Sequence, residues 1–188
     1  MAIEQKARLM TAEELSRFTG DLARRYELVD GELIEMSPPG GEHGEITFEI
    51  GGVIRDFVRP RHLGKLYAAE TGFLIQQSPD KVRAPDVAFV SRARLPEGTS
   101  PPGYVPLAPD FVVEVVSPND SAQDVQARVD DWLKAGTQVV WTVYPGIRTV
   151  LVFRGLEQIE RKSVDDDLDA EPVLPGFRCK ARDLFPEG

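Results

Sequence analysis

Segments in which apolar and polar residues alternate, or in which apolar residues form short runs, recur along the chain and predict β-strands. The clearest local signal is Asp30-Gly31 between two alternating runs, which is typical of a hairpin turn. Residues 110–116 differ, because both faces of this predicted strand are apolar, as in a strand covered on both sides of a sheet. The predicted strands are 26–29, 32–36, 65–70, 73–76, 86–90, 110–116, 138–144 and 148–153, followed by one or two short strands near the C-terminus.

Three other segments carry the spacing of an amphipathic helix. The first begins at Thr11, which stands three residues before Glu14 as in a capping box. The second places apolar side chains at intervals of three and four between residues 46 and 57. The third runs over residues 121–135, and Gly136 ends it.

The order of these elements predicts an α/β (α+β) fold. It would consist of a mixed β-sheet flanked by helices, with an N-terminal helix and hairpin in front. A chain of 188 residues is long enough to bury one sizeable core. We find no internal repeat and no change of composition that marks a boundary, so a single domain over residues 1–188 is expected.

Composition narrows the functional classes. The formal net charge of −9 argues against a protein that coats nucleic acid non-specifically, because phosphate binding depends on clustered Lys and Arg. No apolar run approaches the ~20 residues that span a bilayer, so no membrane partner is expected. The single cysteine, Cys179, has no second cysteine in the chain to pair with, which favours a cytoplasmic location. A site made of carboxylates and a divalent cation is compatible with the acidic balance.

Glu114 is the residue that calls for an explanation. It lies in the middle of the apolar strand 110–116, on the same face as Val112 and Val116. An unpaired ionised carboxylate in such a place costs several kcal/mol, so Glu114 must be protonated, paired or bound to a metal.

Asp86 is a second carboxylate that could meet Glu114. It follows Ala84-Pro85 at the start of a predicted strand. If the two strands are neighbours, the carboxylates converge on one point and form an oxygen-rich site suited to Mg²⁺ or Mn²⁺. Taken alone, Asp86 could equally be an ordinary strand-start residue, and Glu114 could belong to a buried ion pair.

Arg128 is the candidate cation near Glu114. On the helix 121–135 it lies at the edge of the apolar stripe that contains Val125 and Trp132, whereas Lys134 points to the opposite side. Arg128 can therefore reach back toward the sheet. Two interpretations remain open at this point: a functional cation beside a metal site, or a salt bridge that only neutralises Glu114.

His43 begins the helix that contains Ile46, on nearly the same face. An imidazole there could act as an acid, a base or a metal ligand, or could make only a local hydrogen bond. Glu70 is a possible third carboxylate, although a surface strand residue is the simpler interpretation. His62 is interpreted as a solvated loop residue.

Taken together, Ala84-Pro85-Asp86-Val87, the strand 110–116 followed by Ser117-Pro118, and a helix ending Ala135-Gly136 resemble the putative restriction endonuclease family of the PD-(D/E)XK nuclease superfamily. The segments 26–32 and 174–177 are similar too, so the resemblance extends over residues 11–185. It implies a restriction-endonuclease-like core, with Asp86 and Glu114 as ligands of Mg²⁺ or Mn²⁺ for hydrolysis of phosphodiester bonds.

The chain departs from the superfamily pattern at the basic residue. Val116 stands where the motif expects lysine, and the resemblance implies that this lysine has moved to the next helix, where the chain has Arg128. Arginine stays protonated and acts as a fixed charge, so it is a poor general base. His43 could share the proton transfer under this resemblance.

Two functions follow as expectations. The first is a metal-dependent endonuclease acting on nucleic acid, with DNA as the expected substrate and Asp86, Glu114, Arg128 and His43 as catalytic residues. The second is a nuclease-like fold with weak or no activity, which serves as a binding or oligomeric structural module. A homo-oligomer, a dimer or larger, is expected because cleavage of both strands by a single-site nuclease favours a dimer.

Overall fold

The computed structural model of the chain describes residues 8–18, 25–95 and 99–186. The helices are α1 (Ala12–Ser16), α2 (Gly41–Val58) and α3 (Ala122–Lys134), and short 3₁₀ turns occur at Arg92–Arg94, Pro145–Ile147 and Ala181–Leu184. The strands are β1 (Arg25–Val29), β2 (Glu32–Met36), β3 (Gly64–Ala68), β4 (Phe73–Gln76), β5 (Lys81–Arg83), β6 (Val87–Ser91), β7 (Phe111–Val115), β8 (Val139–Tyr144), β9 (Thr149–Phe153), β10 (Ile159–Lys162), β11 (Asp167–Asp169) and β12 (Arg178–Lys180).

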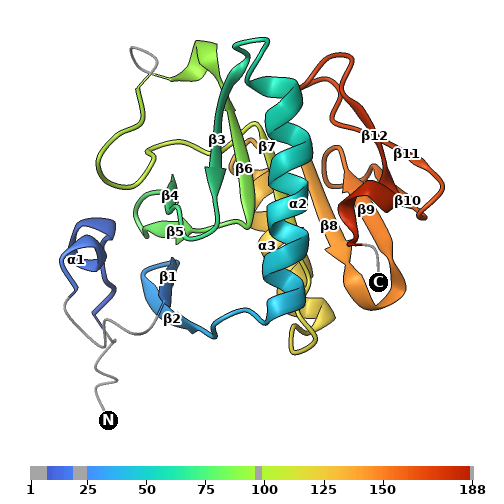
Figure 1. The fold of residues 1–188 in the computed structure, drawn as a ribbon. Helices are drawn as coiled ribbons and strands as arrows, with labels where there is room; N and C mark the ends of the chain where they lie inside the picture. Colours follow the sequence, from blue (N-terminus) through green and yellow to red (C-terminus); the bar gives the residue numbers. More distant parts are fainter. Residues whose placement is uncertain (1–7, 19–24, 96–98, 187–188) are drawn as a thin grey trace.

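A six-stranded mixed sheet forms the centre of the molecule, in the order β10-β9-β8-β7-β6-β3. The strands β7 and β8 are parallel and are joined by α3, because a parallel connection needs a crossover long enough for a helix. The other neighbouring pairs in this sheet are antiparallel. Figure 1 shows α2 along one side of this sheet, with α3 behind it.

The two long helices cover opposite faces of the six-stranded sheet. On one face Ile46, Ile50 and Ile54 of α2 pack with inward residues of β6, β7 and β8. On the other, Val129 and Trp132 of α3 pack with Ala88, Val112 and Val140. This double covering explains the apolar character of both faces of β7, and it confirms the mixed sheet flanked by helices.

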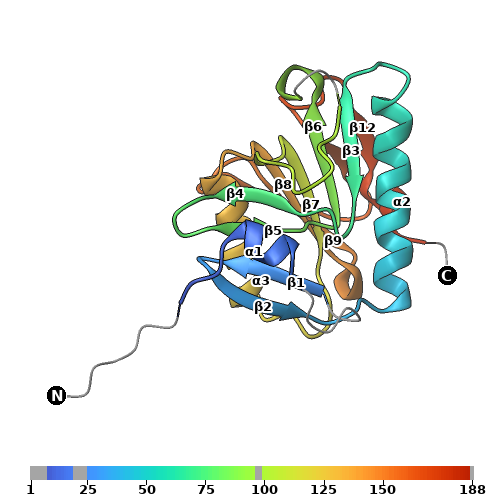
Figure 2. The same ribbon diagram turned by 90° about the vertical axis from the view of Figure 1, so that its left-hand side faces the viewer.

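The N-terminal helix and hairpin are confirmed, but the hairpin belongs to a second sheet and the helix packs on that sheet. Thr11 caps α1 in a capping box with Glu14. The Asp30-Gly31 turn joins β1 to β2, with positive φ at both residues, as the hairpin signal predicts. The order of this sheet is β2-β1-β5-β4, and α1 packs on it through Leu15. Figure 2 shows this part of the molecule in front of the central sheet.

The sequence pattern missed some strands. β5 is only three residues long and carries Lys81 and Arg83, so no alternating pattern marks it. The C-terminal part contains three strands, β10, β11 and β12, where one or two were expected. The last two form a separate ribbon on the side of the sheet away from β1 and β2 (Figure 1).

The segment 84–86 passes from the second sheet to the central one, because β5 belongs to the former and β6 to the latter. β6 and β7 are antiparallel with Val87 opposite Val113. One residue further along this register, Asp86 comes beside Glu114. Side chains directly opposite in an antiparallel pair lie on the same face, so the topology brings the two predicted carboxylates together.

Candidate active site

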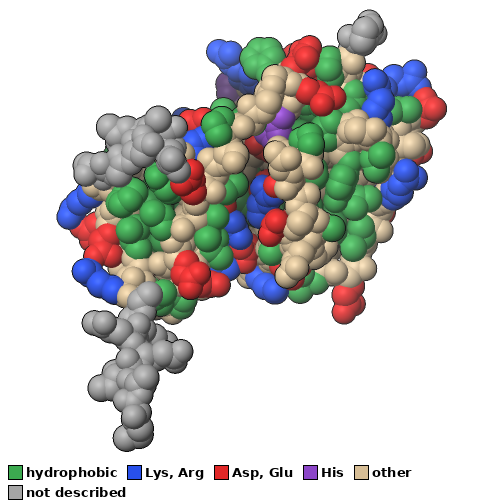
Figure 3. Space-filling model, turned by 90° about the horizontal axis from the view of Figure 1, so that it is seen from below, with side chains coloured by type: hydrophobic (Ala, Val, Ile, Leu, Met, Phe, Trp, Pro, Cys, Tyr) green, Lys and Arg blue, Asp and Glu red, His purple; other side chains and the backbone are tan. Residues whose placement is uncertain are grey.

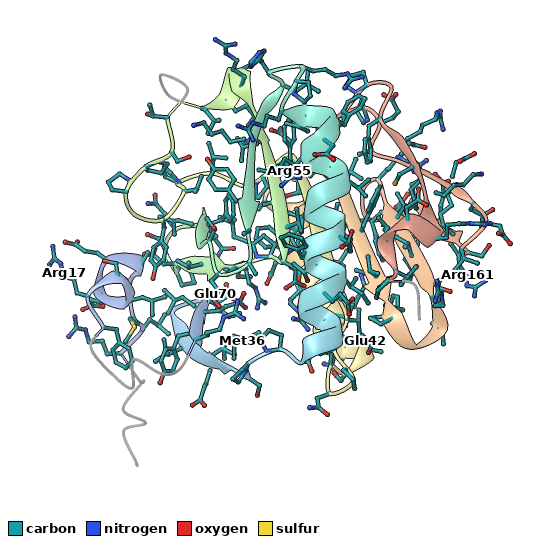
Figure 4. The ribbon with its side chains drawn as sticks, viewed as in Figure 1. Arg17, Met36, Glu42, Arg55, Glu70 and Arg161 are labelled. Carbon is teal, nitrogen blue, oxygen red and sulfur yellow. The ribbon has the colours of Figure 1, made fainter. Side chains whose placement is uncertain are left out.

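A cleft of about 280 Å³ lies where the two sheets meet. Figure 3 looks at this side of the molecule, which is hollowed between two lobes, and acidic, basic and histidine side chains meet in the hollow. Met36 and Glu70 belong to the cleft lining. Figure 4 labels both, on the side of the molecule where α2 begins near Glu42. The charged lining residues are Arg25, Glu27, Glu70, Asp86, Glu114 and Arg128.

A wider hollow of about 590 Å³ lies beside α1. Its charged groups form ion pairs with one another, Arg8 with Glu14 and Arg17 with Glu13. None of the described charged residues that line it is buried, so the cleft between the sheets is the candidate site.

Asp86 is held at the floor of the cleft by two contacts. Its Oδ2 accepts a hydrogen bond from the backbone N–H of Val115 at 2.7 Å, and the same oxygen lies 3.2 Å from Nε2 of His43. The side chain is only 14% exposed. These contacts fix the carboxylate next to the residue that follows Glu114.

Glu114 accepts a hydrogen bond from the indole N–H of Trp132 at 2.7 Å. Burial raises the pKa of Glu114 to about 8, and the negative charge of Asp86 contributes in the same direction. The positive charge of Arg128 and the Trp132 hydrogen bond oppose this shift. Burial of a carboxyl group together with a nearby negative charge is an arrangement in which a pKa rises this far.

Arg128 also lines the cleft, but its ion-pair partner is Asp120 and not Glu114. Between Arg128 and Glu114 the structure shows only a longer-range electrostatic attraction. Burial would lower the pKa of Arg128, but the charges of Glu114 and Asp120 outweigh it and raise the pKa. The interpretation of Arg128 as a direct salt-bridge partner of Glu114 is therefore wrong, because Asp120 in the loop before α3 holds the guanidinium.

His43 lies in the first turn of α2 and faces Asp86. The hydrogen bond to Asp86 raises the pKa of His43, although burial works against it. Its Nδ1 lies 3.5 Å from the Thr47 hydroxyl, so the local contact expected of a helix histidine is present as well. His43 is therefore both a helix residue with a local partner and a neighbour of the candidate carboxylate.

Glu70 lies at the rim of the cleft, where it pairs with Arg25 of β1 at 3.4 Å. Its side chain is 68% exposed, so it is not a third buried carboxylate beside Asp86. His62 is exposed in the turn after α2, as predicted.

The sequence did not reveal a buried charge network behind the cleft. Glu27 is 4% exposed and accepts hydrogen bonds from Arg83 Nη1 at 2.6 Å and from the backbone N–H of Ala84 at 2.9 Å. Arg83 also donates to Asp131 of α3, which pairs with Lys81. The one signal in the sequence was Lys81-Val82-Arg83, in which two basic residues flank a valine.

The donor chemistry of the cleft fits a hard divalent cation. Among the described residues, no group of three or more His, Cys, Asp or Glu side chains is placed to hold a metal ion. Two carboxylates are nevertheless what Mg²⁺ commonly takes from a protein, with water and substrate phosphate supplying the remaining ligands. The pKa of Glu114, raised by burial and then by the charge of Asp86, agrees with this, because a cation between the two carboxylates would lower it.

Comparisons with known proteins agree with this geometry. A family model described as "Putative restriction endonuclease" (Uma2) matches residues 12–182. A crystal structure described as "a putative nuclease belonging to DUF820", from Anabaena variabilis ATCC 29413, has 25% sequence identity and a TM-score of 0.79, and the match covers 94% of this chain and 97% of that one. A search of curated proteins finds no match.

No helix among residues 8–18, 25–95 and 99–186 is long and apolar enough to cross a membrane. The family match extends over most of the chain, and the solved DUF820 protein shares its fold over nearly the full length of both proteins. The chain therefore belongs to the putative restriction endonuclease family and has the fold of a restriction-endonuclease-like nuclease.

Proposed function

We propose that the protein is a nuclease that hydrolyses phosphodiester bonds of nucleic acid with a divalent cation, Mg²⁺ or Mn²⁺, held by Asp86 and Glu114. The observation that supports this most strongly is that Asp86 and Glu114 line the same cleft, where burial and the charge of Asp86 raise the pKa of Glu114 to about 8. The family description points to DNA as the substrate. A cation bound there would supply positive charge to stabilise the developing negative charge on the phosphate.

The surrounding residues have distinct roles in this proposal. The Val115 N–H and His43 hold Asp86 in position, and Trp132 holds Glu114. Arg128, fixed by Asp120, offers a permanent positive charge at the cleft wall. A guanidinium there stabilises a phosphate by charge and by directed hydrogen bonds.

Proton transfer falls to His43 rather than to Arg128. A guanidinium does not lose its proton near neutral pH, whereas an imidazole can hold or release one. His43 Nε2 lies 3.2 Å from Asp86 Oδ2, so the imidazole contacts one of the two carboxylates that line the cleft. The hydrogen bond to Asp86 orients the ring and favours its protonated form.

Metal binding and cleavage test this proposal together. Calorimetric titration with Mn²⁺ is expected to show one site in the native chain and a loss of affinity in Asp86→Asn and Glu114→Gln that exceeds the about 10- to 100-fold typical of residues that only support a ligand. Cleavage of plasmid DNA and of single-stranded oligonucleotides should require the metal and both carboxylates. Asp165→Asn, in the exposed pair with Arg182, serves as the matched control. Cleavage that survives Asp86→Asn would place the reaction elsewhere.

A second candidate is a nucleic-acid-binding module of low activity. It is favoured by Arg128, which is engaged with Asp120 and cannot serve as a base. Under this alternative, Mn²⁺ binds with Asp86-dependent affinity but cleavage stays at the level of Asp86→Asn. The same two measurements therefore separate the two functions.

A further inference from the structure

We propose that the cleft takes a single unpaired nucleotide, so that the preferred substrate is single-stranded nucleic acid, with a base stacked on Tyr104. This inference rests on the proposed function and names the substrate class of the same site. Its support comes from three properties of the cleft: its size, the aromatic side chains in its wall and the charge of the chain around it.

The size of the cleft limits what can reach the carboxylates. Its volume of about 280 Å³ is at the lower end of sites that hold small organic ligands. Glu114 is 8% exposed, and the Asp86 side chain 14%. A phosphate must therefore enter the cleft to contact them, and an unpaired strand can deliver one phosphate with its nucleotide where a rigid duplex cannot.

Tyr104 forms a fixed aromatic surface in the cleft wall. The backbone next to it is tied to β4 by hydrogen bonds from Val105 N–H to the Gly72 carbonyl and from Leu74 N–H to the Val105 carbonyl, both at 2.9 Å. The ring packs so closely on Gly72 that a Cβ at that position would lie 2.4 Å from a ring carbon. The ring is thus supported on one side by backbone, while it still lines the cleft.

Tyr26 supplies a second aromatic side chain to the same cleft, from strand β1. Its ring makes an edge-to-face contact with Phe18 at 5.4 Å, and both Tyr26 and Tyr104 pack on the small core around Leu28 and Val82. Aromatic side chains on a fixed framework beside a phosphate-binding group are the usual means of holding single strands, because every base offers a π face.

The charges of the cleft agree with one strand rather than two. The lining holds two basic residues, Arg25 and Arg128, which pair with Glu70 and Asp120, beside four acidic ones, so it can contact one or two phosphates and not the backbone of a duplex. The chain as a whole carries a net charge of −9, which opposes broad contact with the dense charge of a duplex. Stacking therefore has to provide affinity that a basic surface would provide in a duplex-binding protein.

Binding measurements test the proposal without requiring cleavage. The probes are a fluorescein-labelled oligothymidylate of about twelve nucleotides, within the footprint of known single-strand sites, and a blunt hairpin duplex with the same label, both titrated in Ca²⁺. Fluorescence anisotropy should show at least tenfold tighter binding of the single strand. Equal or tighter binding of the duplex would overturn the proposal.

Substitutions of Tyr104 locate the binding. Tyr104→Ala should weaken the single-strand complex by about 5- to 140-fold, the equivalent of about 1–3 kcal/mol for one stacked base. Tyr104→Phe keeps the ring and should bind like the native chain. Phe48→Ala, at an aromatic residue on α2 that is 74% exposed, is the control for non-specific stacking. If Tyr104→Ala does not fold, Tyr104→Leu keeps apolar bulk on Gly72 without a π face and decides the question.

The outcomes separate this inference from the proposed function. Tight, Tyr104-dependent binding of the single strand without metal-dependent cleavage would refute the proposed nuclease activity. It would support single-stranded nucleic acid as the ligand of the cleft. Metal-dependent cleavage of duplex DNA, with Tyr104→Leu as active as Tyr104→Phe, keeps the nuclease and refutes the substrate class.

Discussion

The backbone N–H of Val115 donates a hydrogen bond to Asp86 Oδ2 at 2.7 Å, at the point where the pairing of β6 and β7 ends. This bond continues the hydrogen-bond ladder between β6 and β7 by one step, with a side-chain oxygen as the acceptor in place of a backbone carbonyl. It fixes the Asp86 carboxylate beside the residue that follows Glu114. The separation of the two carboxylates is therefore set by the central sheet and not by a flexible loop.

The pH dependence of stability should reveal the buried carboxylate. The pKa of Glu114 in the folded chain is about 8, against an ordinary value of 4.5, so between these values the folded state keeps a proton that the unfolded state has lost. Stability of the metal-free protein should therefore fall as pH rises through this window. Glu114→Gln should remove that part of the slope, with a gain on the order of a few kcal/mol at pH 8 and almost none at pH 4. Urea unfolding followed by circular dichroism measures both.

His43 provides the control for this experiment. Its pKa is also raised, so its contribution to stability is present below its ordinary pKa of 6.5 and is lost as pH rises through its higher folded value. His43→Gln should change the slope only above about pH 6. A Glu114→Gln variant with the native slope between pH 4.5 and 6 would show that Glu114 is ionised in the metal-free fold.

The carboxylate pair could be predicted from the sequence because its signal is local. Charged side chains are rarely buried, so an acidic residue in the apolar run 110–116 stands out. The apolar residues of the same run predicted a strand covered on both faces. The partners of Glu114 and Arg128 could not be predicted in this way. Trp132 was assigned to the helix core because its apolar ring fits that stripe, and nothing in the spacing shows that its N–H meets Glu114. Asp120 lies in a loop, where no periodicity fixes a direction.

Metal affinity should depend on pH in the opposite direction to stability. A cation binds the ionised form of Glu114, so the proton held with a pKa of about 8 must leave. Affinity for Mn²⁺ should rise by up to about tenfold per pH unit below pH 8 and level off above it. Titration calorimetry in two buffers of different ionisation heat should register the released proton at pH 7, and no such proton in Glu114→Gln. An affinity that is constant from pH 6 to 8 would contradict a metal ligand at Glu114.

Trp132→Phe tests whether the indole hydrogen bond positions Glu114. The substitution removes the donor at 2.7 Å, and this bond lowers the pKa of Glu114, so its loss should raise that pKa and move metal binding to higher pH. The loss of a hydrogen bond to a buried carboxyl should also cost about 1–3 kcal/mol of stability. Trp141→Phe is a matched control: Trp141 is equally buried, and within the described chain its indole nitrogen has no hydrogen-bond partner. It should leave the pH profile of Mn²⁺ binding unchanged.

Arg128 should contribute a charge to cleavage and not a proton. Arg128→Met is expected to lower the cleavage rate by about 10²–10³-fold with Mn²⁺ affinity reduced much less, because the charge acts on the phosphate rather than on the cation. Arg128→Lys keeps the charge and can orient a water, so it should retain most of the rate. Single-turnover rates across pH separate these effects, with Arg17→Met at the C-cap of α1 as a surface control. Equal rates for Arg128→Met and the native chain would exclude a role at the phosphate.

Variants of the charge network behind the cleft should show how far the stability of the fold can be separated from the positioning of Asp86. Arg83→Met leaves the buried Glu27 without its cation, while Asp131 keeps its ion pair with Lys81, and the loss should cost about 3–5 kcal/mol. Neutralising Glu27 in the same chain, by Glu27→Gln, should recover most of that loss, and Asp131 stays ionised because it is the partner of the buried Lys81. The amide introduced by Glu27→Gln keeps an oxygen for the Ala84 N–H, which precedes Asp86 by two residues, and Mn²⁺ affinity should survive. With Glu27→Leu in its place, stability should again recover but Mn²⁺ affinity should fall, because the segment that presents Asp86 has then lost its anchor.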